Sequence, residues 1–233
     1  MSAGDDRLRR ALDGVRGIEV STAGIQAAID QVILAMPSVL QVTGAGLMVV
    51  DGDLSLSAVS WSDEPGRVLE LTQEEIGRGP CVDSLVNDDV VLVADLDADP
   101  RWPEVSAAAV PLGVRAVVGV PVRVDGDGIA SLNAYRSSPG EWTSEEVDAV
   151  LSFAGVLEQL IGVAVLAGRN EGLIDQLQQA LDSRVVIERA VGLVMGRRGI
   201  DAVGAFNVLR GLARRERRRV FEIATDVLGG REL

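Results

Sequence analysis

The first recognisable pattern along the chain is a helical one in residues 22–44. Its apolar side chains recur three and four positions apart, as Ile25, Ala28, Ile29, Val32, Ile33 and Met36. Pro37 falls inside this pattern and predicts a kink or an early end of the helix. Residues 5–15 ahead of it are compatible with a further short helix.

The spacing then changes to that of β-strands. The apolar runs 45–50 and 54–61 flank Asp51-Gly52-Asp53, and the runs 114–124 and 128–136 meet at Asp125-Gly126-Asp127-Gly128, so each pair predicts a hairpin. Residues 90–96 add another strand, and residues 97–113 predict a loop followed by a short helix. Capping-box spacing at Thr72–Glu75 and Thr143–Glu146 predicts a brief helix and a long helix. We therefore expect an α+β domain, an antiparallel sheet with flanking helices.

Beyond residue 172 every hydrophobic pattern is helical. A first helix is expected from Leu173 to Met195, ending at Gly196 or Gly199, and Asp201 is placed to cap a second. A third helix is expected from Arg218 to Leu228, which completes an all-α three-helix bundle. The predicted division is an N-terminal segment 1–19, a domain 20–166 and a domain 167–233.

The first helix of this bundle carries a heptad seam with one charge in it. The seam positions are Leu173, Leu177, Ala180, Arg184, Ile187, Val191 and Val194. A guanidinium on an apolar seam is costly unless it is paired or reaches water. Arg184 therefore either forms an ion pair with Glu188, four residues on, or marks a place where the seam opens to receive an anion.

Composition limits the chemistry that is open to the chain. Without histidine, the usual acid–base and zinc sites lose their main ligand, and the sequence shows no nucleophile–base pair, Walker loop or metal-ligand cluster, so we expect neither an enzyme nor a metal site. One cysteine and the lack of a secretory or membrane-spanning pattern favour a cytoplasmic protein.

Charge is divided unevenly along the chain. The formal net charge is −13, yet five of the six residues from Arg214 to Arg219 are arginine. The exception is Glu216. Such a run is either a solvated turn or a clamp for phosphates, and spacing alone leaves RNA, DNA and an acidic protein open as partners.

Residues 177–228 resemble the ANTAR domain, an RNA-binding module of bacterial transcription antiterminators. The matching residues are Ala180, Leu181, Ser183, Arg184, Ile187, Ala190, Gly192, Met195, Ala205, Phe206, Leu209, Ala213, Ile223 and Ala224. Many members carry Asn where Arg217 stands here. The resemblance implies binding of paired RNA stem-loops with hexanucleotide loops, which prevents a terminator hairpin from forming. The residues expected to contact RNA are Ala180, Ser183, Arg184, Arg214, Arg215, Arg217, Arg218 and Arg219.

Residues 20–165 resemble a GAF domain, through the segments 77–84, 93–104, 114–122 and 130–135. GAF domains sense small molecules or dimerise, so the resemblance implies a sensor or a homodimer platform. No cofactor is predicted and the ligand is unknown, but Trp61, Cys81 and Trp102 are candidates to line a ligand pocket. Cys81 is alternatively a buried packing residue, and both tryptophans are alternatively parts of the core.

The sequence as a whole predicts a transcription antitermination regulator that binds RNA as a homodimer and has no membrane segment. Two other classes stay open at this point. One is a DNA-binding regulator, because three small helices also describe helix-turn-helix proteins. The other is a protein–protein adaptor whose arginines meet an acidic partner.

Overall fold

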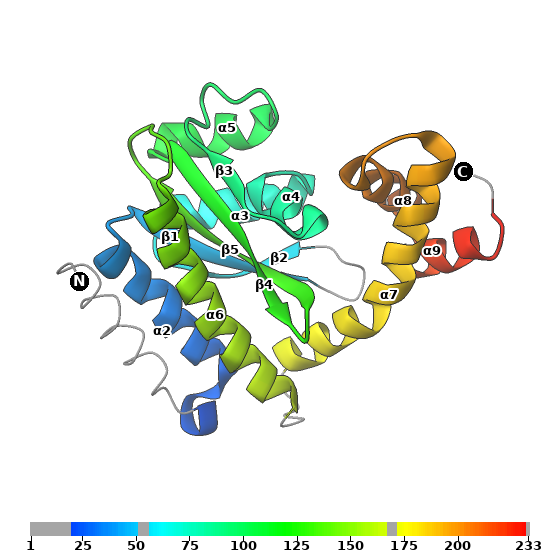
Figure 1. Ribbon diagram of the computed structural model, residues 1–233, viewed down its shortest axis with the longest axis horizontal. Helices are drawn as coiled ribbons and strands as arrows, with labels where there is room; N and C mark the ends of the chain where they lie inside the picture. The colour runs from blue at the N-terminus through cyan, green and yellow to red at the C-terminus, as the bar shows by residue number, and fades with distance from the viewer. Residues whose placement is uncertain (1–19, 51–55, 167–171, 232–233) are drawn as a thin grey trace.

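The computed structural model describes residues 20–50, 56–166 and 172–231 of the 233-residue chain, and Figure 1 shows their arrangement. The predicted helix at residues 5–15 and the turn at Asp51-Gly52-Asp53 lie outside the described residues. Within them, five strands form one antiparallel sheet in the order β2-β1-β5-β4-β3. The strands are β1 (Gly44–Val50), β2 (Leu56–Trp61), β3 (Val91–Val93), β4 (Ala116–Val124) and β5 (Asp127–Arg136).

Helices cover both faces of this sheet. On one face lie α2 (Val20–Leu40) and α6 (Ser144–Leu166), packed on each other and on the sheet. On the other face lie α3 (Glu64–Ile76), α4 (Pro80–Asn87) and α5 (Pro103–Ala109), with the short 3-10 helix η1 (Val110–Leu112) after α5. All six apolar residues of the predicted N-terminal pattern are buried in the core, so that prediction is confirmed. The α+β class of the first domain is confirmed as well.

The predicted helix boundaries hold in some places and fail in others. The Thr143–Glu146 capping box is present, because the Thr143 amide donates to Glu146 at 2.8 Å and the Glu146 amide donates to Thr143 Oγ1 at 3.3 Å. The other predicted capping box, Thr72–Glu75, does not begin a helix, so that prediction was wrong: these residues lie inside α3. That helix is instead capped by Asp63, which accepts from the Gly66 amide at 2.9 Å. Pro37 lies within α2, and the non-helical residue of that helix is Gly24.

Three helices complete the chain. They are α7 (Gly172–Arg198), α8 (Ala202–Glu216) and α9 (Val220–Leu228), and Figure 1 shows α7 leading away from the sheet to the other two. Their shared core contains Ile187, Phe206, Leu209, Ile223 and other apolar residues. Asp201 caps α8 as predicted, accepting from the Gly204 amide at 2.7 Å. The third helix begins two residues later than predicted, at Val220.

Helix α6 alone, among the described residues, is long and apolar enough to span a membrane. Its position in the fold accounts for that composition. Its buried residues, Phe153, Leu157 and Ile161 among them, face the sheet and α2. It is therefore a core helix of the first domain.

Candidate RNA-binding surface

The arginine run lies at the junction of α8 and α9. Arg214 and Arg215 occupy the last turn of α8, Arg217 is its C-cap, and Arg219 is the N-cap of α9. All five arginines of the run are exposed. The chain reverses here because Arg217 adopts the left-handed conformation (φ 55°, ψ 42°), and the Arg218 amide then donates to the Ala213 carbonyl at 3.0 Å.

Carboxylates neutralise one part of this surface. Arg218 donates to Asp226 at 2.6 Å and to Glu222 at 3.1 Å. Hydrogen bonds to these two carboxylates raise the pKa of Arg218, and the bond from Arg218 lowers the pKa of Asp226. Within the part of the chain that the structure describes, Arg214, Arg215 and Arg217 form no ion pair. These three guanidiniums carry the free charge of the surface.

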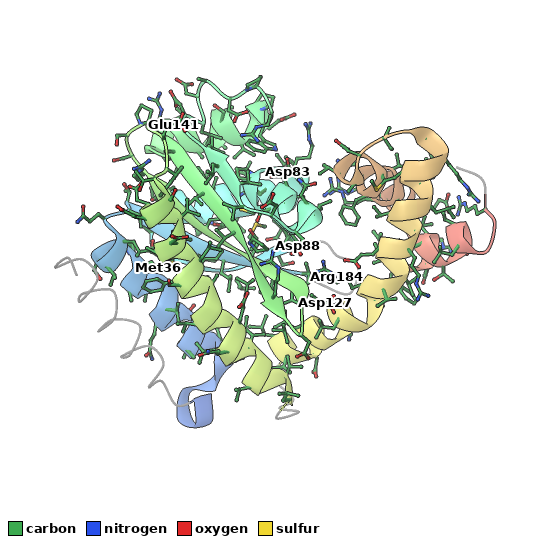
Figure 2. All side chains as sticks on the ribbon, viewed as in Figure 1. Met36, Asp83, Asp88, Asp127, Glu141 and Arg184 are labelled. Carbon is green, nitrogen blue, oxygen red and sulfur yellow. The ribbon has the colours of Figure 1, made fainter. Side chains whose placement is uncertain are left out.

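Arg184 lies elsewhere, between the two domains. It is only 9% exposed, and its Nε donates to Glu188 at 2.5 Å, so the predicted ion pair along α7 is confirmed. Its Nη1 donates to the carbonyl of Gly128 in the β4–β5 hairpin. Figure 2 shows Arg184 beside Asp127 of the same hairpin, whose carboxylate lies 3.6 Å from Nε. In this arrangement the first domain therefore covers the heptad seam of α7 at Arg184.

The other two predicted contacts on α7 lie near Arg184. Ser183 is buried, at 8% exposure. Ala180 belongs to the same helix, but its side chain lies outside the described residues. The predicted RNA contacts with described side chains thus form two separate sets, one exposed at the α8–α9 junction and one, Ser183 and Arg184, buried on α7.

The three predicted pocket residues do not come together. Trp61 is at the end of β2 and is 37% exposed, whereas Trp102 is buried in a cluster with Leu69, Val105 and Tyr135. Cys81 is buried in the main core. Burial raises the pKa of the Cys81 thiol well above its ordinary value, which disfavours the reactive thiolate.

A buried polar cluster surrounds Cys81, and the sequence did not reveal it. Asn133 Nδ2 donates to both oxygens of Glu70, at 2.9 and 3.0 Å. Gln73 accepts from the Cys81 amide at 2.9 Å and donates to its Sγ at 2.7 Å. Burial raises the pKa of Glu70 to about 8, against the lowering effect of the hydrogen bonds that Glu70 accepts from Asn133 and Cys81. The one available signal was a glycine within a strand pattern, because Gly46 of β1 leaves the space that the Glu70 side chain fills.

Two cavities flank α4 where the domains meet. One, of about 260 Å³, is lined by Leu85 and Val86 of α4 and by α7 residues that include Arg184 and Val191. The other, of about 200 Å³, lies between α3, α4 and α8, with Arg210 and Arg214 in its wall. Among the described residues no group of acidic or cysteine side chains could hold a metal ion.

Comparison with known families agrees with this architecture. A GAF domain model matches residues 24–161, and the chain belongs to that family. An ANTAR domain model matches residues 175–228, so the chain is a two-domain GAF–ANTAR protein. ANTAR is an RNA-binding domain of antitermination regulators and GAF is a sensor domain, and both domains are regulatory and not catalytic. A comparison with curated proteins gives no match.

Solved structures resemble the first domain in fold. The GAF domain of an Acinetobacter phosphoenolpyruvate-protein phosphotransferase is 17% identical, with a TM-score of 0.56, over 73% of this chain and 100% of that one. Free methionine-R-sulfoxide reductase from Neisseria meningitidis is 19% identical, with a TM-score of 0.54, over 69% of this chain and 92% of that one. At these identities the likeness extends to the fold alone.

Proposed function

We propose that this protein is a transcription antitermination regulator whose ANTAR domain binds paired RNA stem-loops with hexanucleotide loops. One observation carries the proposal. Arg214, Arg215 and Arg217 are exposed together at the α8–α9 junction of an RNA-binding module, without carboxylate partners in the described chain. Guanidiniums bind phosphates bidentately, and such contacts supply most of the affinity for nucleic acid.

The roles of the remaining predicted residues follow from their surroundings. Arg218 and Arg219 border the three guanidiniums and add to the positive potential, although Arg218 also holds α9 in place through Glu222 and Asp226. Ala180, Ser183 and Arg184 contact RNA only after α7 leaves the β4–β5 hairpin, because Arg184 is bound there to Gly128. The arrangement described here is then a closed state with part of the RNA surface covered.

The GAF domain would set the balance between closed and open states by sensing a signal, by dimerising, or by both. Formation of a homodimer is supported by three exposed apolar side chains on the same helical layer. They are Leu34 of α2 and Val163 and Leu166 of α6. A dimer would present two arginine surfaces to two stem-loops, and linked sites raise apparent affinity when the geometry fits. We propose a cytoplasmic regulator without enzymatic activity.

The test is a titration of a fluorescent paired-hexaloop RNA at several salt concentrations. Arg214→Gln/Arg215→Gln should weaken binding by roughly tenfold and reduce the salt slope by about two. The matched control is Arg189→Gln/Arg198→Gln, which removes the same charge from exposed positions of α7. Equal losses in both double variants would contradict the proposed surface. Preference for a palindromic duplex would favour the DNA-binding class, and absence of nucleic-acid binding would favour the adaptor.

A further inference from the structure

Two guanidiniums line the smaller cavity at the domain junction, and a third lies near one of them. Arg210 and Arg214 line it from α8, and Ser57, Gln73 and Glu74 line it from the GAF domain. Arg78 follows α3 and lies close enough to influence the charge of Arg210. Gly77 makes this approach feasible, because a Cβ at that position would overlap the Arg210 guanidinium. Gly77 also adopts a left-handed conformation (φ 62°) that ends α3.

Arg210 is unusual among the half-buried arginines of this protein. Arg115 is held by Asp95 at 2.9 Å and Arg136 by Glu146 at 2.8 Å. Arg210 has no carboxylate partner among the described residues and donates instead to the Asn207 side chain at 2.8 Å. Burial, together with the charges of Arg214 and Arg78, lowers the pKa of Arg210 to about 10. A half-buried cation beside two others is costly, so an anion bound at this site would be stabilised.

We propose that the cavity binds a small ligand through a phosphate group held by Arg210 and Arg214. Two guanidinium forks match the oxygens of a phosphate. Ser57 offers a hydrogen bond from the GAF domain, and Phe206 and Leu85 offer apolar contact to the body of a phosphate ester. Glu74, the carboxylate in the described lining, accepts from the Ala58 amide at 2.9 Å. Its charge favours a compact monophosphate over a longer polyanion.

The position of the site gives the ligand a regulatory effect. The phosphate would bridge Ser57 in β2 of the GAF domain and the two arginines of α8 in the ANTAR domain, and so stabilise the closed state. Arg214 also belongs to the RNA surface, so ligand and RNA would compete for it. This competition rests on the proposed function, whereas ligand binding itself does not.

Isothermal titration calorimetry of the full chain, without RNA, tests the site. Inorganic phosphate and glycerol 3-phosphate are the probes, and sodium chloride at matched ionic strength is the control. We expect 1:1 binding that Arg210→Gln weakens by about tenfold or more and that Arg210→Lys, which keeps the charge but loses the fork, weakens less. Tighter binding of glycerol 3-phosphate would identify a phosphate ester as the ligand class, and equal binding would identify free phosphate.

Arg189→Gln is the matched control, since Arg189 is an exposed arginine of α7 outside the cavity. It should leave phosphate binding within twofold of the wild type. Thermal unfolding without phosphate separates binding from folding, because removing a crowded cation should leave Arg210→Gln at least as stable as the wild type. Absence of phosphate binding, or equal weakening by Arg189→Gln and Arg210→Gln, would overturn the proposal. Because no RNA is present, neither result depends on the antitermination function.

Discussion

At the scale of single residues, Glu70 is the most unusual side chain of the GAF domain. It is fully buried, bonded to Asn133 and close to Cys81, with 3.5 Å between Cys81 Sγ and Glu70 Oε2. Its raised pKa means that the folded protein keeps the Glu70 proton up to about pH 8, whereas the unfolded chain loses it near the ordinary value of 4.5. Between these values the folded state binds more protons, so stability is lost as the pH rises.

Replacing Glu70 by Gln should remove this pH dependence. In the wild type, Glu70 lowers the free energy of unfolding by up to about 1.4 kcal/mol per pH unit between about pH 5 and pH 8. Glu70→Gln keeps the shape and a hydrogen-bonding group, so its advantage over the wild type should grow across that range and level off above it. Urea unfolding at several pH values measures the difference. Parallel pH profiles for the two proteins would show that Glu70 is not the titrating group.

At the scale of elements, the α8–α9 turn places a positively charged side chain on a residue with an unfavourable backbone conformation. Arg217 is a non-glycine residue in the left-handed region, which costs an L-amino acid about 1–2 kcal/mol. Asparagine tolerates this conformation better than arginine does. An arginine here therefore lowers stability and, in the proposed function, adds a phosphate contact.

Arg217→Gly should therefore stabilise the protein by about 1 kcal/mol and weaken RNA binding. The same substitution two residues earlier gives the opposite sign. Arg215→Gly places glycine in the last turn of α8, where it should cost about 1 kcal/mol. Chemical denaturation measures the free energy of unfolding of both variants, which should rise for Arg217→Gly and fall for Arg215→Gly. Destabilisation by both would show that the left-handed cap is not a source of strain.

Sequence patterns predicted the elements whose signals are local. The Asp201 cap, the Thr143–Glu146 capping box and the buried face of α2 all follow from spacing within one turn or two. The start of α3 was missed because Thr72–Glu75 repeats a capping pattern inside a helix, while Asp63 followed by Glu64-Pro65 carries the true cap. Local patterns do not show whether a helix already exists at a given position.

The buried cluster and the covered Arg184 could not be predicted for a different reason. Glu70 and Asn133 are 63 residues apart, and Arg184 and Gly128 are 56 apart. Each contact depends on how the sheet, α3 and α7 pack together. The heptad seam indicated that Arg184 needed a partner, and Glu188 was identifiable as one, but the hairpin from the other domain was not.

At the scale of the whole molecule, the central feature is the docking of the ANTAR domain on the GAF domain. Val86 of α4 packs against the core of the three-helix bundle and lines both junction cavities. Arg184 is held at the same interface by the β4–β5 hairpin. A difference in free energy between the docked and undocked arrangements would set the balance between closed and open states.

Val86→Asp should open the molecule by placing a charge in this apolar contact. We expect a larger radius of gyration by small-angle X-ray scattering and RNA binding tighter by up to about tenfold, since the closed fraction no longer reduces the apparent affinity. Leu92→Asp is the matched control, because Leu92 is an exposed apolar residue of β3 in the same domain. A larger radius without tighter binding would show that docking does not cover the RNA surface.

Photo-crosslinking of a paired-hexaloop RNA to the full chain, followed by mass spectrometry, tests the central claim most directly. The account predicts crosslinked peptides from the α8–α9 junction, residues 214–219, in the wild type, with peptides around Arg184 added in Val86→Asp. Crosslinks confined to the GAF domain, or none above those of a scrambled hairpin, would contradict the assignment of this surface to RNA.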